Sequence, residues 1–123
     1  MKVTFALFGA NELRRSLQKI CDDMAMKSKQ ETYAAGLETQ RIAKLRLKGK
    51  EGGTRAWKTG HLAGSIIVDK LDKGMIVEVG PTAPYGPYVE HGTRKMKERP
   101  FLYPAYDKVA EKFPKKIIEG CKR

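Results

Sequence analysis

The sequence predicts a single α+β domain with a long N-terminal helix, a small antiparallel sheet built on one β-hairpin, and a C-terminal helix. Three observations support this fold class. Residues 11–47 contain no proline and repeat apolar side chains at helical spacing, residues 64–80 are rich in β-branched side chains around a glycine turn, and residues 103–119 return to helical spacing. The 123 residues amount to one ordinary domain.

The long helix is expected over residues 11–47, with Asn11 as its N-cap and Gly36 as the position that favours a kink. A straight helix of this length measures about 55 Å, whereas a compact domain of this size has a radius of gyration of about 14 Å. The helix must therefore bend, split into a hairpin, or project. Its first apolar stripe consists of Leu13, Leu17, Ile20 and Met24.

A second apolar stripe is shifted around the same helix. We expect the β-hairpin of the same chain to cover the first stripe, so the second stripe needs another partner. We predict that this partner is another copy of the chain, because identical subunits that pack head to tail form a ring when the rotation closes. The second stripe consists of Tyr33, Leu37, Ile42 and Leu45.

Two irregular segments flank the long helix. An arm is expected over residues 1–10 and a flexible loop over residues 48–58, where Gly49, Gly52 and Gly53 occur among charged residues. The loop lacks the order G-x-x-x-x-G-K-[S/T], so we do not expect it to bind a nucleotide phosphate.

The β-hairpin is expected over residues 64–80, with a turn at residues 72–74 and with Pro81 after the second strand. A short element and a basic loop follow at residues 85–99. Within them, residues 88–91 suit either a strand or one helical turn.

The closing helix is expected over residues 103–119. Pro104 suits its first position, and Pro114 is expected to kink or end it.

The charge of the chain favours acidic partners. Its 25 Lys and Arg against 14 Asp and Glu give a net charge of +11, with the excess at the two ends and a neutral middle over residues 49–90. Such a balance indicates a polyanion or an acidic protein surface as partner and says nothing about fold. The candidate phosphate contacts, which suit a solvated loop equally well, are Arg94, Lys95, Lys97 and Arg99.

Metal, cofactor and membrane sites are not expected. Cys21 and Cys121 show no metal-ligand spacing and are expected to be free thiols, with a single disulfide between them as the open alternative. The sequence contains no run of about 18 apolar residues, so we do not expect a membrane span.

The residues that could carry catalysis are few. His61 and His91 each lie beside a glycine in predicted loops, and neither belongs to a nucleophile–base or metal pattern. We therefore expect a protein without enzymatic activity. A small basic endoribonuclease remains an alternative, with a candidate cluster of Tyr85, Tyr88, His91, Arg94 and Arg99.

Three segments together resemble one protein family. Residues 59–66 resemble its "TG-x-L-x-x-SI" entry to the hairpin, residues 77–93 its "V-G-P … Y-x-x-Y-V-E-x-G-T" signature, and residues 99–105 its "RPFL-x-PA" block. The family is that of the HK-ninety-seven gene-ten-like neck or tail-completion proteins of tailed bacteriophages. The matching residues are Thr59, Gly60, Leu62, Ser65, Ile66, Gly80, Pro81, Tyr85, Tyr88, Glu90, Gly92, Thr93, Arg99, Pro100, Phe101 and Pro104.

The resemblance implies a structural virion protein. Such a protein would form a ring, with six as the natural count in a phage tail, at the head–tail junction between head-closure or adaptor proteins and the tail terminator or tube. The basic ring would surround a DNA channel without reading sequence, after assembly in the host cytoplasm. A cellular domain that binds RNA or DNA without sequence preference remains the alternative from another class.

We expect structural roles for the motif residues. Gly60, Gly80 and Gly92 would permit backbone conformations that a side chain obstructs. Glu90 would accept backbone N–H bonds near Gly92 and Thr93 and so fix the turn.

Overall fold

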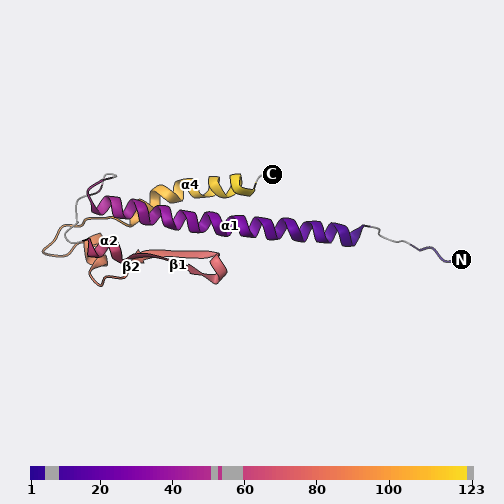
Figure 1. Cartoon of the computed structure of the whole chain (residues 1–123), viewed down its shortest axis with the longest axis horizontal. Coiled ribbons are helices and arrows are strands. Elements are labelled where there is room, and N and C mark those ends of the chain that lie inside the picture. The colour runs from indigo at the N-terminus through magenta and orange to yellow at the C-terminus, as the bar shows by residue number, and fades with distance from the viewer. Residues whose placement is uncertain (5–8, 51–52, 54–59, 122–123) are drawn as a thin grey trace.

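The computed structural model spans the 123 residues. We describe all of them except residues 5–8, 51–52, 54–59 and 122–123, and for residues 120 and 121 we describe the backbone only. In chain order the elements are α1 (Ala10–Leu47), α2 (His61–Ser65), β1 (Ile66–Leu71), a 3₁₀ turn (Asp72–Gly74), β2 (Ile76–Pro81), α3 (Gly86–His91) and α4 (Tyr103–Cys121). The predicted α+β class is confirmed. Figure 1 shows the hairpin and α4 beside one half of α1, while the other half extends toward the N-terminus without them.

Helix α1 is continuous over 38 residues, which corresponds to about 57 Å. It begins after Gly9, whose φ of 78° is left-handed, and Asn11 lies inside its first turn, so the predicted N-cap is wrong. Gly36 does not interrupt the helix. It lies buried against the hairpin, where an added Cβ would be 2.6 Å from Cγ1 of Val77. Of the three alternatives for the long helix, the structure therefore adopts the projecting one.

Strands β1 and β2 pair antiparallel, with Ile66 opposite Pro81 and Leu71 opposite Ile76. Residues directly opposite one another share a face of the sheet. The face toward α1 carries the valines that approach Gly36, namely Val68, Val77 and Val79. The other face carries Ile67, Asp69, Leu71, Ile76, Gly80 and Glu78.

Two short helices occupy segments for which the sequence predicted a loop or left the choice between strand and helix open. His61 was expected in a polar loop but begins α2, which starts after Gly60 in a left-handed conformation with φ of 80°. Residues 88–91, left open between strand and helix, belong to α3.

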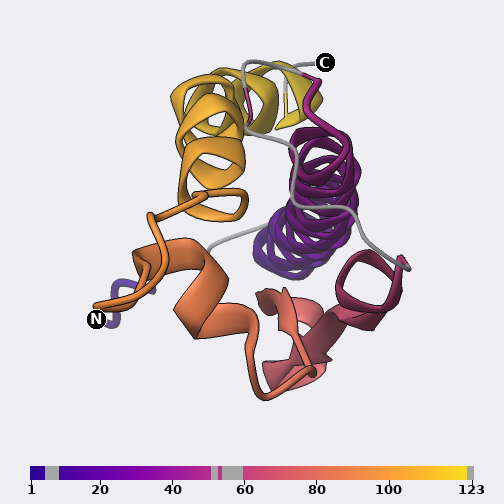
Figure 2. The ribbon, with the colours of Figure 1, turned by 90° about the vertical axis from the view of Figure 1, so that its left-hand side faces the viewer.

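Helix α4 runs antiparallel to α1 (Figure 1) and extends two residues beyond its predicted end. Pro104 is its second residue, and Pro114 lies inside it. Pro114 is exposed, so its ring does not disturb the packing of α4 on α1, and the helix continues past it. Viewed along α1, α4 and the hairpin lie on two different sides of that helix (Figure 2).

The hairpin and α4 reach only part of α1. The Gln40 side-chain amide donates to the Ile66 carbonyl at 2.7 Å, and at the far end of the hairpin Gly74 lies against the Lys29 side chain. Near the start of α4, the Arg46 guanidinium donates to the Pro100 carbonyl. Both elements thus begin near the C-terminal end of α1, and a 19-residue α4 covers about 28 Å of a 57 Å helix.

The hydrophobic core lies around the C-terminal part of α1. It consists of Ile42, Ala43, Leu47, Leu62, Ala63, Ile66, Ala83, Phe101 and Ala105.

The position of this core reverses the expected roles of the two apolar stripes. Leu13, Leu17 and Met24, which the hairpin was expected to cover, are 61%, 53% and 45% exposed, whereas Ile42 is 6% exposed. The predicted subunit contact at Ile42 is wrong, because that side chain belongs to the core of the chain itself. Local periodicity is similar in both stripes, and only the reach of the hairpin and α4 decides which one is covered.

Candidate functional site

The second and third motif segments meet at one buried carboxylate. Glu90, on α3, is 6% exposed and accepts the backbone N–H bonds of Phe101 and Leu102 at Oε2, at 2.9 and 3.0 Å. Its Oε1 accepts the N–H of Tyr103 at 3.1 Å. These donors stand at the start of α4, where N–H groups lack helical partners and the helix dipole favours negative charge.

Glu90 thus binds backbone N–H groups as expected, but its partners lie 11 to 13 residues ahead rather than at Gly92 and Thr93. A backbone bond from the Arg99 N–H to the Val89 carbonyl, at 2.8 Å, joins the same two segments. The carboxylate is therefore a structural group that fixes α4 relative to α3.

The basic run between these segments forms a tight turn. Gly92 has φ of 78°, and a Cβ there would lie 2.8 Å from the Glu98 nitrogen, so only glycine fits without movement. Thr93 and Met96 exchange backbone hydrogen bonds across the turn. Of the candidate phosphate contacts, Arg94, Lys95 and Lys97 are exposed, whereas Arg99 is half-buried.

The first motif segment joins α2 to the sheet and to α1. Leu62 and Ile66 are core residues, and the Ser65 hydroxyl donates to the Leu62 carbonyl at 2.7 Å. The Thr82 N–H and hydroxyl both donate to the Ser65 carbonyl. Thr59, the first residue of the motif, lies outside the described residues, as do most residues of the predicted loop 48–58.

The structure does not require glycine at every position where we expected a special backbone conformation. Gly60 has a left-handed backbone as expected, but Gly80 has neither a positive φ nor any atom within 4 Å of an added Cβ. The close approach lies instead at Gly86, where a Cβ would be 2.5 Å from Cγ of Pro81. This contact holds the start of α3 against the end of β2.

The two histidines contact tyrosines in different places. His61 Nδ1 lies 2.8 Å from the Tyr85 hydroxyl, and the two rings are stacked. His91 contacts the ring of Tyr103, with centroids 5.6 Å apart. Of the candidate ribonuclease cluster, Tyr85 thus pairs with His61, and His91 contacts Tyr103, which was not in the cluster.

Within the described part of the chain, there is no group of three metal-ligating side chains. In the same residues, no helix is long and apolar enough to cross a membrane. Cys21 is a free, exposed thiol.

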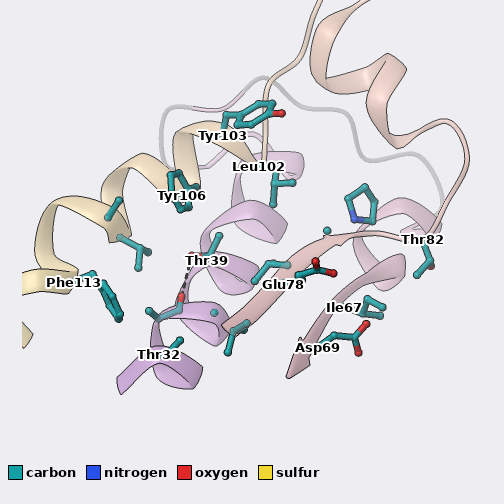
Figure 3. Close-up of a pocket in the computed structure, with 18 residues that line it drawn as sticks. Thr32, Thr39, Ile67, Asp69, Glu78, Thr82, Leu102, Tyr103, Tyr106 and Phe113 are labelled. Atoms are coloured by element: carbon teal, nitrogen blue, oxygen red, sulfur yellow. Dashed lines mark hydrogen bonds between the residues drawn. The ribbon is translucent and has the colours of Figure 1, made fainter. Parts of the chain in front are cut away.

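A groove of about 830 Å³ lies between α1, β2 and α4 (Figure 3). Small residues of α1, among them Ala35 and Gly36, form its floor. Val79 and Glu78 of β2 stand on one side, and Tyr106 and Phe113 of α4 on the other. Asp69 and Glu78 are the charged residues of its lining, both acidic, and they occupy directly opposite positions in the hairpin. We refer to this surface as the α1–β2–α4 groove.

Sequence reasoning missed this groove because three distant segments create it. The available signal was the combination of small residues on one face of α1 with an aromatic stripe on α4 at Tyr103, Tyr106 and Phe113. Neither feature alone predicts that a groove forms between α1, β2 and α4.

Electrostatic contacts also connect α1 to α4. The Arg41 guanidinium forms a bidentate ion pair with Glu38 and lowers the pKa of that carboxyl, with smaller contributions in the same direction from Lys112 and Lys116 of α4. The positive charge of α4 thus lies near Glu38 of α1.

Comparison with known proteins gives one family. A family model described as "Bacteriophage HK97-gp10, putative tail-component" matches residues 11–92, which is two thirds of the chain. The match includes α1, the hairpin and Glu90 and stops before the third motif segment, which supplies the N–H groups that Glu90 binds. No curated protein and no solved structure matches the chain.

Proposed function

The chain belongs to the bacteriophage HK97-gp10 family of tail components, and on that premise we propose that it closes into a ring of identical subunits at the head–tail junction. A tail component is a structural part of the virion and contacts other virion proteins. In our proposal the neighbours are the head-closure or adaptor proteins on one side and the tail terminator or tube on the other. The ring assembles in the host cytoplasm, and six copies would match the symmetry of a phage tail.

The observation that carries this proposal is the projecting half of α1. Residues 10–27, which we call the projecting segment, carry an exposed apolar stripe that includes Leu13, Leu17 and Met24. Nothing in the described chain covers them. An apolar stripe on a helix that extends from the domain is typical of a surface that a partner buries.

Most of the second stripe is not available for the subunit contact that we expected it to form. Ile42 is in the core, Tyr33 lies under the Lys70 ammonium, 4.1 Å from its ring centroid, and Leu45 is half-buried. Leu37 is the one exposed residue of that stripe, at 42%, and we keep it as a proposed contact with a neighbouring virion subunit.

The basic surface suits a DNA channel. Arg94, Lys95 and Lys97 are exposed together on one turn, and the chain carries a net charge of +11. Side chains of this kind neutralise phosphates without reading bases, so we expect any DNA binding to be non-specific and to weaken steeply with salt.

We propose further that the protein has no catalytic activity. Glu90 is occupied by three backbone N–H groups, and the two histidines contact separate tyrosines. His61→Ala and His91→Ala should therefore leave the yield of infectious particles unchanged. A tenfold loss with normal folding would contradict this.

The exposed turn at Arg94, Lys95 and Lys97 also favours a second candidate, a domain that binds RNA or DNA outside any particle. A gel-shift titration distinguishes the two. Tight binding of free RNA or DNA at physiological salt, by a chain that stays monomeric in size-exclusion chromatography, would favour the second candidate.

The test of the main proposal is an amber mutation in the gene for this chain, followed by electron microscopy and mass spectrometry of the particles. We expect filled heads and unattached tails without the chain, and a fixed copy number per particle with it. Leu37→Asp should leave the free protein folded while reducing incorporation. Purified infectious particles that contain no copy of the chain would overturn the proposal.

A further inference from the structure

The α1–β2–α4 groove is acidic in a chain that is strongly basic. Its lining includes 18 residues, of which two are carboxylates and none is Lys or Arg, although the chain has 25 basic residues and 14 acidic ones. Asp69 and Glu78 occupy opposite positions on the outer face of the hairpin. Like charges placed directly opposite each other destabilise a β-hairpin, so this arrangement favours a cationic partner.

The walls of the groove are apolar. Val77 and Val79 of β2, with Val109 and Phe113 of α4, line it beside Tyr106, which is exposed at its mouth (Figure 3). The occupant that suits these walls has an apolar face with basic side chains next to it.

The projecting segment has that composition. Its stripe of Leu13, Leu17, Ile20 and Met24 spans about 17 Å along the helix, and the wall of α4 from Tyr103 to Phe113 spans about 15 Å. The segment carries four basic side chains, Arg14, Arg15, Lys19 and Lys27, against three acidic ones, Glu12, Asp22 and Asp23, which gives a net charge of +1. Arg14 lies three residues before Leu17 and Lys27 three residues after Met24, so both are neighbours of the stripe on the helix surface. The groove, with its two carboxylates, has the opposite charge.

The segment cannot occupy the groove of its own chain. The floor of the groove is α1 itself, from Thr32 to Thr39, and the projecting segment continues the same unbroken helix away from it (Figure 1). The occupant that the structure supports is therefore the projecting segment of another copy.

We propose that the projecting segment of one copy, residues 10–27, docks into the α1–β2–α4 groove of the next copy. This inference rests on the proposed ring, to which it assigns the two mating surfaces. The contact is heterologous, since a different surface of each copy takes part, and its repetition gives a closed ring or an open chain according to the rotation between neighbours. Arg14 or Lys27, which lie beside the stripe, then neutralises Asp69 and Glu78.

The experiment uses two variants of the full chain that each remove one surface. Leu17→Asp places a charge on the stripe, and Tyr106→Lys places a cation in the acidic groove. Both side chains are more than half exposed, so we expect both variants to fold, as checked by circular dichroism and thermal midpoint. If one does not fold, Leu13→Asp or Glu78→Lys replaces it, since both positions are also exposed.

The matched controls change the same residue types elsewhere. Met26→Asp alters an exposed apolar side chain nine residues after Leu17, on the opposite face of α1. Tyr88→Lys alters an exposed tyrosine of α3 that does not line the groove.

Sedimentation measures association at low salt between about 1 μM and 1 mM protein. We expect the unaltered chain and both controls to associate as concentration rises, and each surface variant to remain monomeric, with at least tenfold weaker self-association. An equimolar mixture of Leu17→Asp and Tyr106→Lys should form a 1:1 complex and nothing larger, because it retains one intact segment and one intact groove.

Four results would overturn the docking proposal. They are an unaltered chain that stays monomeric over the whole range, surface variants that associate like it, controls that lose association equally, and a mixture that stays monomeric. Failure of the proposed ring gives a different result from failure of the docking proposal, because the ring proposal fails when purified infectious particles lack the chain. Particles that contain the chain while the mixture stays monomeric would mean that the ring uses other surfaces.

Discussion

The two halves of α1 have the same secondary structure but depend on different interactions. Residues 28–47 bury Ile42, Ala43 and Leu47 against the hairpin, α2 and α4, whereas residues 10–27 expose their apolar stripe. An isolated helix of about 18 residues is marginal in water because nucleation is costly. The packed half supplies that nucleus, and the projecting half extends it one residue at a time. Helical structure alone therefore does not show where the domain ends.

The largest expected effect comes from the same substitution made in each half. Leu47 is 1% exposed, and Leu47→Ala should lower the free energy of unfolding of the protein by about 2–5 kcal/mol, because a cavity forms in the core. Leu17→Ala should change it by less than about 0.5 kcal/mol. Urea unfolding measures both values. Similar costs at the two positions would mean that the projecting segment is packed in the free protein.

The next effect tests how α4 is held on the packed half. Glu90→Gln replaces a carboxylate that accepts three backbone N–H bonds with an amide that has one accepting oxygen, and should cost about 2 kcal/mol. Amide exchange at residues 101–103 should accelerate, as read by NMR. Glu98→Gln, on an exposed side chain of the neighbouring turn, is the control and should have little effect.

Two substitutions with smaller effects, one in each half of α1, should change the stability of the protein in opposite directions. Ser16→Ala, on the exposed projecting segment, should stabilise the protein by about 0.5 kcal/mol through helix propensity. Gly36→Ala should instead destabilise it by about 1 kcal/mol, because the new Cβ would lie 2.6 Å from Cγ1 of Val77.

Thermal unfolding measures both substitutions, and the Val77→Ala background provides the internal check. Once this valine is shortened, Gly36→Ala should destabilise the protein less, because only Cγ1 of Val68, at 3.1 Å, remains close to the new Cβ. Stabilisation by Gly36→Ala without that second change would mean that the hairpin does not press on α1.

The smallest effect concerns pH. The Arg41 ion pair lowers the pKa of Glu38 below its ordinary value of 4.5 in the folded chain. The pair therefore stabilises the fold above that value, and this contribution is lost as pH falls through the lower, folded-state pKa. Because both side chains are more than one third exposed, solvent screening limits it to about 0.3 kcal/mol.

Comparison with Glu38→Gln at pH 7 and pH 3 tests this contribution. The variant should be slightly less stable at pH 7 and equal to the unaltered protein at pH 3. A difference that persists at pH 3 would show that the substitution acts through packing.

Local patterns were sufficient for the class of fold, with its long N-terminal helix, its antiparallel hairpin and its C-terminal helix, but not for α2. The proline-free run, the hairpin turn at residues 72–74 and the four-three-four spacing near Tyr106 each act over a few residues. The choice of which stripe is covered was not local. It depends on contacts such as that of Gln40 with Ile66, 26 residues apart, which no periodicity encodes.

The candidate site shows the same limit. A structural role for Glu90 follows from its position in a turn motif, but its partners at residues 101–103 are known only once α3 and α4 are placed. The groove depends on three segments at once. The acidic pair Asp69 and Glu78 was visible in the sequence only as two separate charges, since the hairpin register brings them opposite each other.

The projecting half of α1 also acts mechanically as a lever. It is fixed at one end by the core and extends about 27 Å beyond the covered part, so a tilt of about 5° at its base moves its tip by about 2 Å. Long helices bend gently at little cost, and the subunit body need not deform. In the proposed assembly, copies with slightly different spacing could therefore each reach a neighbour. The curvature of that assembly could vary while every contact within the chain stays the same.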